Sequence, residues 1–192
     1  LFLRGNYMII KRDYYLKKII DKRENGRIKI ITGIRRCGKS YLLFNLYQEY
    51  LLSQGIKEEQ IISIALDEID NLEYRNPFKL NEYIKEKTKN RNQMYYIFID
   101  EIQLSEAVIN PYIDSKEKNV TFVDVLLGLM KRNNVDIYVT GSNSKMLSSD
   151  VLTQFRDRGN EIHVNPLSFA EVYDLYENKE SAFEHYIVYG GM

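Results

Sequence analysis

The chain has 192 residues, of which 44% are hydrophobic and 28% charged, an ordinary composition for a globular protein with one α/β core. Its 27 basic and 27 acidic residues cancel, so no net charge indicates nucleic acid or a membrane surface as a partner. Cys37 is the only cysteine, which excludes a disulfide and a cysteine-rich metal site. There is no signal peptide and no apolar run of about 18 residues, so we expect a cytoplasmic protein without a membrane segment.

The N-terminal part of the chain is rich in basic residues. Residues 1–36 carry 11 Lys and Arg against 3 Asp and Glu. A solvated helix is the simpler interpretation of this stretch, and a basic docking surface is the alternative. Residues 1–7 look like none of the later elements, so we expect an extension that precedes a domain start at Met8. The apolar spacing over residues 12–23 predicts a helix.

Residues 28–40 contain the most informative motif of the chain. A β-branched run, IKIIT, leads into Gly33-x-x-x-x-Gly38-Lys39-Ser40, and an apolar helical pattern follows. This is the spacing of a phosphate-binding P-loop, whose inward-turned backbone N–H groups bind the anion and whose glycines allow the sharp bend. The lysine of such a loop reaches the β- and γ-phosphates of ATP, and the serine hydroxyl completes the coordination of Mg²⁺. The alternative is a glycine-rich turn that binds nothing. The residues expected to contact the nucleotide are Gly33, Ile34, Arg35, Arg36, Cys37, Gly38, Lys39, Ser40 and Tyr41.

Strand and helix patterns alternate along the rest of the chain. This alternation predicts an α/β fold in which helices flank a parallel sheet on both faces, as in a P-loop NTPase. The segment 103–120 has few periodic signals and is predicted to be a long loop. Strands are predicted at 61–66, 94–100, 135–141 and 161–164, and helices around Leu80 and over 122–130, 144–154, 168–177 and 181–188.

An acidic pair, Asp100-Glu101, follows the buried strand YYIFID. In an open α/β sheet, ligands bind at the carboxyl ends of the strands. We therefore interpret the pair as a Walker B element, in which Asp100 holds Mg²⁺ and Glu101 orients the attacking water. A solvated strand end is the alternative, and the P-loop upstream makes it the weaker one.

A third strand also ends in polar residues, VTGSNS at positions 139–144. A side chain at this point can contact the γ-phosphate or the attacking water. Asn143 is the first candidate for this sensor role and Ser142 the second. Ordinary turn chemistry explains the same residue types equally well.

Two arginines lie between this strand and the next, in the segment QFRDRGNEI. Arg156 or Arg158, offered to the γ-phosphate of a neighbouring subunit, would stabilise the charge of the transition state. The alternative is a pair of surface arginines that interact with Asp157 or Glu161.

Four motifs in this order resemble a known family. The segments ITGIRRCGKSYLL, YIFIDEIQ, VDIYVTGSNSKMLSSDVLTQFRDRG and NPLSFAEVY are similar to a family of prokaryotic AAA+-like ATPases, over residues 8–192. The resemblance implies a sheet whose sensor strand separates the P-loop strand from the Walker B strand. It assigns residues 8–178 to the ATPase domain and 179–192 to the start of a lid and C-terminal region. Full-length members continue into a C-terminal domain of restriction-endonuclease-like fold.

The resemblance also implies roles for single residues, and it places the family's arginine finger at Arg158. In the family a glycine precedes that arginine, whereas this chain has Asp157, a carboxylate that could sequester the arginine. The other implied roles are phosphate binding by Gly33, Gly38, Lys39 and Ser40, the acidic pair at Asp100 and Glu101, and the sensor at Ser142-Asn143.

These observations lead to the expectation of an ATPase domain with ATP and Mg²⁺ as its cofactors. A nucleotide-dependent switch that binds ATP with negligible turnover is the alternative. Glu101 favours turnover, whereas the Asp157 departure favours the switch. A homo-oligomer is expected if Arg158 acts on a neighbouring subunit, and a role in handling nucleic acid is a third candidate that rests on analogy.

Overall fold

A computed structural model describes residues 10–113, 118–141, 155, 157–173, 176 and 178–190 of the chain. At its centre is a five-stranded sheet in the order β2-β3-β6-β1-β7, and every neighbouring pair is parallel. The strand β6 thus separates β1, which leads into the predicted P-loop, from β3, which ends in the predicted Walker B pair, and this is the order that the family resemblance implies. The strands are β1 (Ile28–Thr32), β2 (Ile61–Ala65), β3 (Tyr95–Asp100), β6 (Val135–Thr140) and β7 (Gly159–His163).

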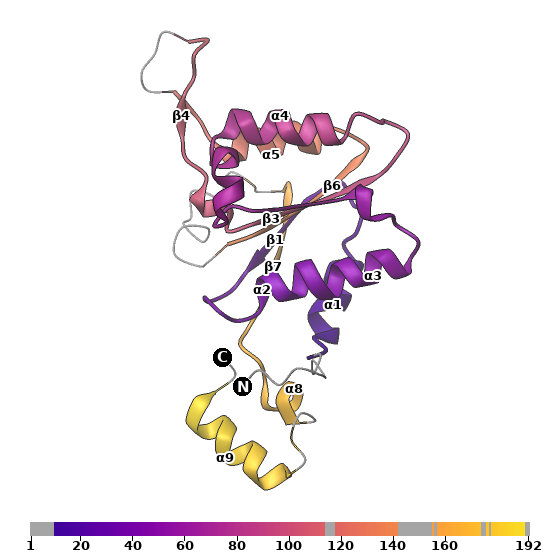
Figure 1. Ribbon diagram of the computed structural model, residues 1–192, viewed down its shortest axis with the longest axis vertical. Coiled ribbons are helices and arrows are strands. Elements are labelled where there is room, and N and C mark those ends of the chain that lie inside the picture. The colour runs from indigo at the N-terminus through magenta and orange to yellow at the C-terminus, as the bar shows by residue number, and fades with distance from the viewer. Residues whose placement is uncertain are drawn as a thin grey trace.

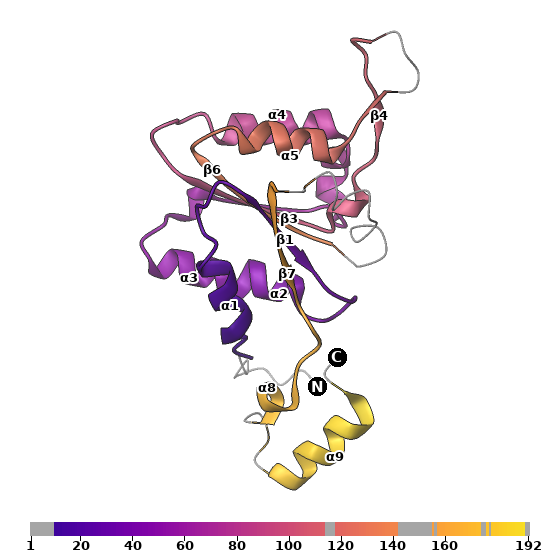
Figure 2. The same cartoon turned by 180° about the vertical axis from the view of Figure 1, so that it is seen from behind.

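Helices cover both faces of this sheet, which confirms the predicted architecture (Figures 1 and 2). One face packs against α1 (Asp13–Ile20) and a continuous helix made of α2 (Lys39–Tyr41), a π-helical stretch (Leu42–Tyr47) and α3 (Gln48–Ser53). The other face packs against α4 (Pro77–Lys87) and α5 (Phe122–Met130). Because both faces are covered, the three central strands are apolar along most of their length and buried throughout.

The helices that cover the second face begin at well-defined caps. Before α4, the side chain of Asn76 accepts a hydrogen bond from the N–H of Phe78 at 3.0 Å, and Pro77 occupies the first helical position. Before α5, Thr121 and Asp124 form a reciprocal capping box. Both caps fix the residue at which the helix begins.

A buried polar network lies near the amino ends of β1 and β6. Lys29 and Asp136 form an ion pair whose side chains are 0% and 2% exposed. The hydroxyl of Tyr138 donates to Oδ2 of Asp136 at 2.6 Å and lies 2.6 Å from the hydroxyl of Tyr47. Burial, and then the charge of Asp136, raises the pKa of Tyr138, which therefore stays protonated as a donor. The network satisfies a buried charge pair that would otherwise be costly.

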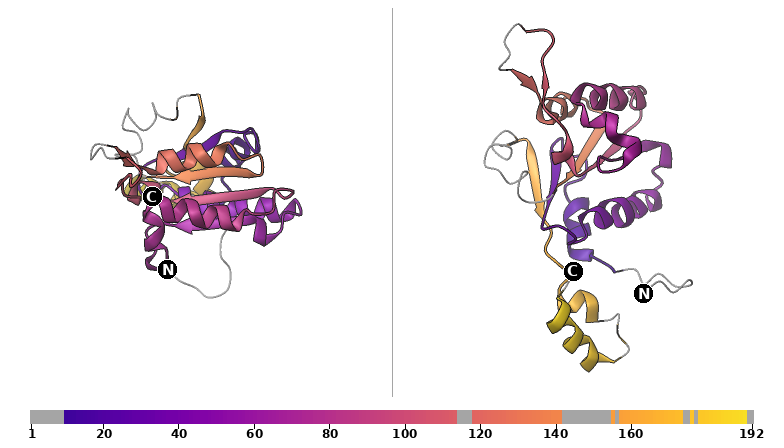
Figure 3. Two further views of the ribbon diagram at one scale, coloured as in Figure 1. Left: turned by 90° about the horizontal axis from the view of Figure 1, so that it is seen from above. Right: turned by 60° about the vertical axis from the view of Figure 1, so that its left-hand side comes forward.

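The segment 103–120 was predicted to be a long loop, and this prediction is wrong in part. A short 3₁₀ turn (Ile102–Leu104) is followed by an antiparallel pair, β4 (Val108–Ile109) and β5 (Asn119–Val120). The pair projects away from the sheet near α4 and α5 (Figure 3). Strands of two residues are too short to show a period in the sequence, which is why the pattern missed them.

The C-terminal part forms a pair of helices, α8 (Phe169–Tyr173) and α9 (Lys179–Tyr189), beyond the carboxyl end of β7 (Figure 1). The ring of Phe169 packs against Phe183 and Tyr186, with ring centroids 5.5 Å apart in each case. These contacts join the two helices into one unit. Two 3₁₀ turns, Glu58–Gln60 and Ile69–Arg75, complete the described elements.

The other predicted elements are found close to their expected positions. The strand β7 begins two residues before the predicted start at 161. The helix predicted over 144–154 lies entirely outside the described residues. Within the described ranges, no helix has both the length and the apolar character needed to span a membrane.

Candidate functional site

The segment between β1 and α2 folds into a tight loop that requires its two glycines. Gly33 has φ 150°, and a Cβ atom here would lie 2.3 Å from the carbonyl oxygen of Val164 and 2.7 Å from Sγ of Cys37. A side chain cannot be placed at such distances, so the loop admits only glycine at this position. Gly38, directly before α2, is left-handed with φ 88°. The sequence motif therefore reflects both close approach and backbone conformation.

The side chain of Lys39 lies against its own loop. Its Nζ donates hydrogen bonds to the carbonyl oxygens of Gly33 at 3.1 Å and Ile34 at 2.9 Å, and the residue is 4% exposed. Ser40 follows in the first turn of the helix and is exposed. An ammonium group, a hydroxyl and the positive end of the helix that starts at Lys39 thus meet at the loop, an arrangement suited to an anion.

The remaining loop residues divide into an outer and an inner group. Ile34, Arg35 and Arg36 are exposed, and Arg36 adopts a left-handed conformation with φ 67°. Cys37 is 1% exposed and packs in the core cluster beneath the loop, so it fills space there. Tyr41 is half-buried at the edge of the same cluster.

The acidic pair lies at the same end of the sheet as the loop. Asp100 ends β3 and is 7% exposed. Its Oδ1 accepts a hydrogen bond from the hydroxyl of Thr140, the last residue of β6. The same hydroxyl accepts a hydrogen bond from the backbone N–H of Glu101 at 3.2 Å. One side chain from the middle strand therefore holds both members of the pair.

Glu101 has an unusual backbone conformation. Its φ is 51°, in the left-handed region that few residues other than glycine adopt. Its carboxylate is half-buried and accepts a hydrogen bond from the side-chain amide of Gln103. The carboxylate thus belongs to the turn that follows β3, and Gln103 orients it there.

The strand register brings the loop after β1 close to the end of β6, where Thr140 holds the acidic pair. Ile31 of β1 is paired with Thr140 of β6, and the N–H of Gly141 donates to the carbonyl oxygen of Ile31 at 3.3 Å. The end of β6 at Gly141 therefore lies beside the end of β1, directly before the loop. The two sensor candidates, Ser142 and Asn143, and also Arg156, lie outside the described residues.

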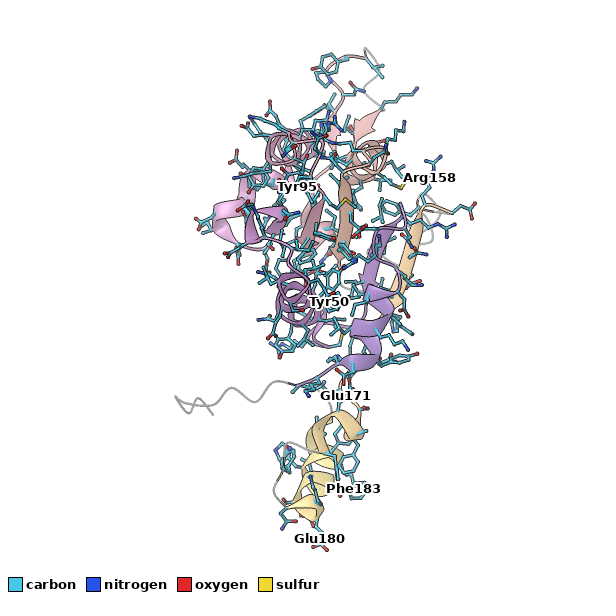
Figure 4. All side chains as sticks on the ribbon, turned by 90° about the vertical axis from the view of Figure 1, so that its right-hand side faces the viewer. Tyr50, Tyr95, Arg158, Glu171, Glu180 and Phe183 are labelled. Atoms are coloured by element: carbon cyan, nitrogen blue, oxygen red, sulfur yellow. The ribbon has the colours of Figure 1, made fainter. Side chains whose placement is uncertain are left out.

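Arg158 is not close to the loop of its own chain. It directly precedes β7, and its backbone carbonyl accepts from the N–H of Ile28 at the amino end of β1, whereas the loop follows the carboxyl end. Figure 4 shows Arg158 and Glu171 at opposite ends of β7. β1 has five residues, so its two ends lie roughly 13 Å apart.

Asp157 stands where the resemblance implies a glycine, and its φ of 64° is a left-handed conformation that glycine adopts readily. Aspartate tolerates this conformation better than most residues do. Asp157 and Arg158 are both exposed, and the ion pairs recorded among the described residues do not join them. The structure therefore gives no support to the idea that Asp157 sequesters the arginine.

Sequence reasoning missed Thr140 and Arg12 as residues of this region. Thr140 offered a weak signal, because it is the last residue of a strand next to the Walker B strand. Arg12 offered no signal, because in the sequence it resembles the other cations of a basic stretch. In the structure, however, it is 1% exposed and donates to the carbonyl oxygen of Cys37 at 2.6 Å.

Comparisons with known proteins agree with this geometry. A family described as "AAA domain" matches residues 25–173. An uncharacterized protein of Haemophilus influenzae is 33% identical over 163 residues, which cover 85% of this chain and 37% of that protein. An uncharacterized protein of Methanocaldococcus jannaschii is 33% identical over 167 residues, which cover 85% and 31%. The chain thus spans about a third of the length of these relatives.

A structural comparison leads to the same fold. PCH-2 of C. elegans matches with a TM-score of 0.59 and 15% identity, over 94% of this chain and 50% of that one. At this identity the match concerns the fold alone. The family match covers most of the chain, including the loop and the acidic pair. The chain belongs to the AAA-domain family, whose fold here is an α/β P-loop nucleotide-binding fold.

Proposed function

We propose that this chain is a Mg²⁺-dependent ATPase domain. One observation carries the proposal, namely that the phosphate loop after β1 and the acidic pair after β3 flank the same strand, β6, at one end of the sheet. A loop that binds phosphate beside a carboxylate pair is the arrangement that phosphoryl transfer requires, because the protein supplies positioning and charge rather than covalent chemistry.

The binding half of the site uses the loop and its lysine. Backbone N–H groups between Gly33 and Lys39 would donate hydrogen bonds to the phosphate oxygens. Nζ of Lys39 would exchange its hydrogen bonds to two loop carbonyls for bonds to phosphate. The exchange favours phosphate because a bond between two charged groups is stronger than one to a neutral carbonyl.

The residues present also fit a magnesium ion. Among the described residues, no three His, Cys, Asp or Glu side chains form a closed metal cage. Mg²⁺ bound with ATP needs only one or two protein oxygens, because phosphates and waters supply the rest. Asp100, oriented by Thr140, and the exposed hydroxyl of Ser40 would supply those oxygens. When bound, the ion would neutralise charge on the β- and γ-phosphates.

The hydrolytic half of the site depends on Glu101. Its carboxylate is positioned beyond the strand end and would accept a proton from, and so orient, the water that attacks the γ-phosphate. Asn143 or Ser142 would contact the same water or the phosphate. Arg158 would act only on a neighbouring subunit, since its own loop lies at the other end of β1, and we therefore propose a homo-oligomer as the active form.

The second candidate function is a nucleotide-dependent switch with negligible turnover. The contact between Gln103 and Glu101 favours it, because a carboxylate that accepts from a neighbouring amide has one oxygen fewer for water. The two candidate functions share the nucleotide site and differ only in whether the carboxylate of Glu101 is available to orient the attacking water.

A titration with a fluorescent ATP analogue tests the shared part of the proposal. The wild-type chain should bind the analogue in the presence of Mg²⁺, and Lys39→Ala should remove most of the affinity. Lys11→Ala, an exposed cation elsewhere in the chain, is the control and should bind as the wild type does. Equal dissociation constants for wild type and Lys39→Ala would refute the site.

A further inference from the structure

Arg12 directly precedes α1, in the basic N-terminal stretch, but its side chain is 1% exposed. A buried guanidinium is costly unless every part of it has a partner. The position of Arg12 in the fold is therefore set by its acceptors, and these come from three separate segments of the chain.

The three acceptors connect the phosphate loop to the C-terminal helices. Nη1 of Arg12 donates to the carbonyl oxygen of Cys37 in the loop at 2.6 Å, and Nη2 donates to the carbonyl oxygen of Asn165, after β7, at 2.8 Å. Nε donates to Oε1 of Glu171 in α8 at 2.9 Å. The guanidinium carbon also lies 4.6 Å from the centre of the Tyr15 ring, so the plane of the group is fixed.

The contact with Cys37 acts on the part of the loop that binds phosphate. The carbonyl of Cys37 and the N–H of Gly38 belong to one planar trans peptide unit, so they point in opposite directions. A donor that holds this carbonyl therefore sets the direction of the Gly38 N–H. Arg12 is also close to Gly38 itself, since its Nη1 lies 3.5 Å from where a Cβ of that glycine would be.

The contacts at the other end act on the start of α8. The backbone N–H of Asn165 donates to the hydroxyl of Tyr15 at 3.1 Å, so the first turn of α1 binds both backbone groups of that residue. The second carboxylate oxygen of Glu171 accepts from the N–H of Ser168 at 2.8 Å and from its hydroxyl at 2.9 Å. This is a capping box, so the same carboxylate begins α8 and binds Arg12.

The unit formed by α8 and α9 has internal packing of its own, and it lies beyond the sheet rather than against it (Figures 1 and 4). Its placement relative to the body therefore depends on the segment after β7 and on the contacts of Arg12. A unit of this kind can change position as a body when one anchoring contact changes.

We propose that Arg12 is a positioning residue that couples the phosphate loop to the α8–α9 unit. Phosphate in the loop and correct placement of α8–α9 each stabilise the same arrangement of Arg12, so each favours the other, as linkage requires. This coupling rests on the proposed nucleotide site. It adds that phosphate binding in the loop affects the placement of the C-terminal helices through the guanidinium of Arg12.

Two variants weaken the coupling from opposite sides. Arg12→Lys keeps the charge but replaces a planar fork by a single ammonium, which cannot reach three acceptors in one plane. Glu171→Gln keeps a side chain that can still cap α8 but removes the carboxylate that pairs with Arg12. Ser168→Ala is the matched control, since it weakens the cap of α8 and leaves the partners of Arg12 in place.

The experiment measures two quantities on the full chain of each variant, after thermal unfolding has established that it is folded. One is the dissociation constant of the fluorescent ATP analogue with Mg²⁺, and the other is hydrogen exchange over residues 165–190 with and without the analogue. In the wild type, the analogue should slow exchange in this segment. Arg12→Lys and Glu171→Gln should each raise the dissociation constant about tenfold and abolish the slowing, and the double variant should be no worse than the more severe single one.

Ser168→Ala should speed exchange in α8 while leaving the dissociation constant and the nucleotide-dependent slowing unchanged. Wild-type affinity and wild-type slowing in both Arg12→Lys and Glu171→Gln would overturn the coupling and leave the nucleotide site standing. Lower thermal stability without a change in the nucleotide response would likewise overturn it, because Arg12 would then be structural only. A wild-type chain that does not bind the analogue would refute the nucleotide site, and the coupling with it.

Discussion

The backbone N–H of Glu101 lies 3.2 Å from the hydroxyl oxygen of Thr140, and the same hydroxyl donates to the carboxylate of Asp100. A buried threonine on the middle strand is thus the common partner of both acidic residues. The contact explains how Glu101 is held in a left-handed conformation, which would otherwise cost of order 1–3 kcal/mol.

Replacement of Thr140 tests this arrangement. Thr140→Val keeps the shape and removes the hydroxyl, so Asp100 and the N–H of Glu101 both lose a partner in a buried place. We expect a loss of about 1–3 kcal/mol in the free energy of unfolding, and a fall in the ATP hydrolysis rate that exceeds any change in ATP affinity. Thr140→Ser retains the hydroxyl and should keep most of the rate. Equal rates for wild type and Thr140→Val would contradict the positioning role.

The network at the amino end of the sheet gives a prediction that concerns stability alone. Tyr138→Phe removes the donor to Asp136 and the partner of Tyr47, so it should lower the free energy of unfolding by about 1–3 kcal/mol. Urea unfolding measures this change. Tyr112→Phe, at a tyrosine that is 87% exposed, is the control and should stay within about 0.5 kcal/mol of the wild type. A Tyr138→Phe variant as stable as its control would show that the hydroxyl contributes nothing.

The site residues predicted from the sequence belong to motifs whose members are adjacent in the chain. The missed residues have partners that are far away in the chain. The loop glycines, the apolar strands and the acidic pair follow from a strand, a turn and a helix that are adjacent in the chain. Arg12 has partners 153 and 159 residues away, so nothing in its neighbourhood distinguishes it from a solvated cation. Lys29 was missed for the same reason, since Asp136 is 107 residues away. The basic stretch over residues 1–36 was interpreted as a solvated helix or a docking surface, and neither interpretation describes these two buried cations.

The dependence of stability on pH follows from Glu171. Burial opposes its ionisation, but hydrogen bonds from Ser168 and Arg12 outweigh burial and lower the pKa of Glu171 from its ordinary value. A lowered pKa in the folded state contributes stability that is complete above the unfolded value of about 4.3 and is lost as the pH falls through the folded value. The difference in unfolding free energy between wild type and Glu171→Gln should therefore be largest near pH 6 and shrink below about pH 4. A difference that stays constant from pH 6 to pH 3 would contradict the assignment.

The position of Arg158 predicts a dependence on protein concentration. If this exposed arginine acts on a neighbouring subunit, ATPase activity per molecule should rise with concentration, and Arg158→Ala should flatten the rise without greatly changing ATP affinity. Arg27→Ala, at an exposed arginine beside the same end of the sheet, is the matched control. A specific activity that does not depend on concentration and is unaffected by Arg158→Ala would refute action in trans.

The residue before that arginine can be tested separately. Asp157 has a positive φ, so Asp157→Gly should raise the free energy of unfolding by up to about 1 kcal/mol. Because the described residues show no ion pair between Asp157 and Arg158, we expect the specific activity to change little. A clear rise in activity, without a matching rise in stability, would instead show that the carboxylate restrains the arginine.

Single-turnover hydrolysis by Glu101→Gln tests the central claim most directly. The amide keeps the size of the side chain but cannot accept a proton from water, so only an interaction of the transition state is removed. We predict that ATP binds with nearly wild-type affinity, while the single-turnover rate of hydrolysis with the protein in saturating excess over ATP falls at least about a hundredfold. A Glu101→Gln chain that hydrolyses ATP at the wild-type rate, or a wild-type chain that binds ATP but shows no turnover at any concentration, would contradict the ATPase assignment.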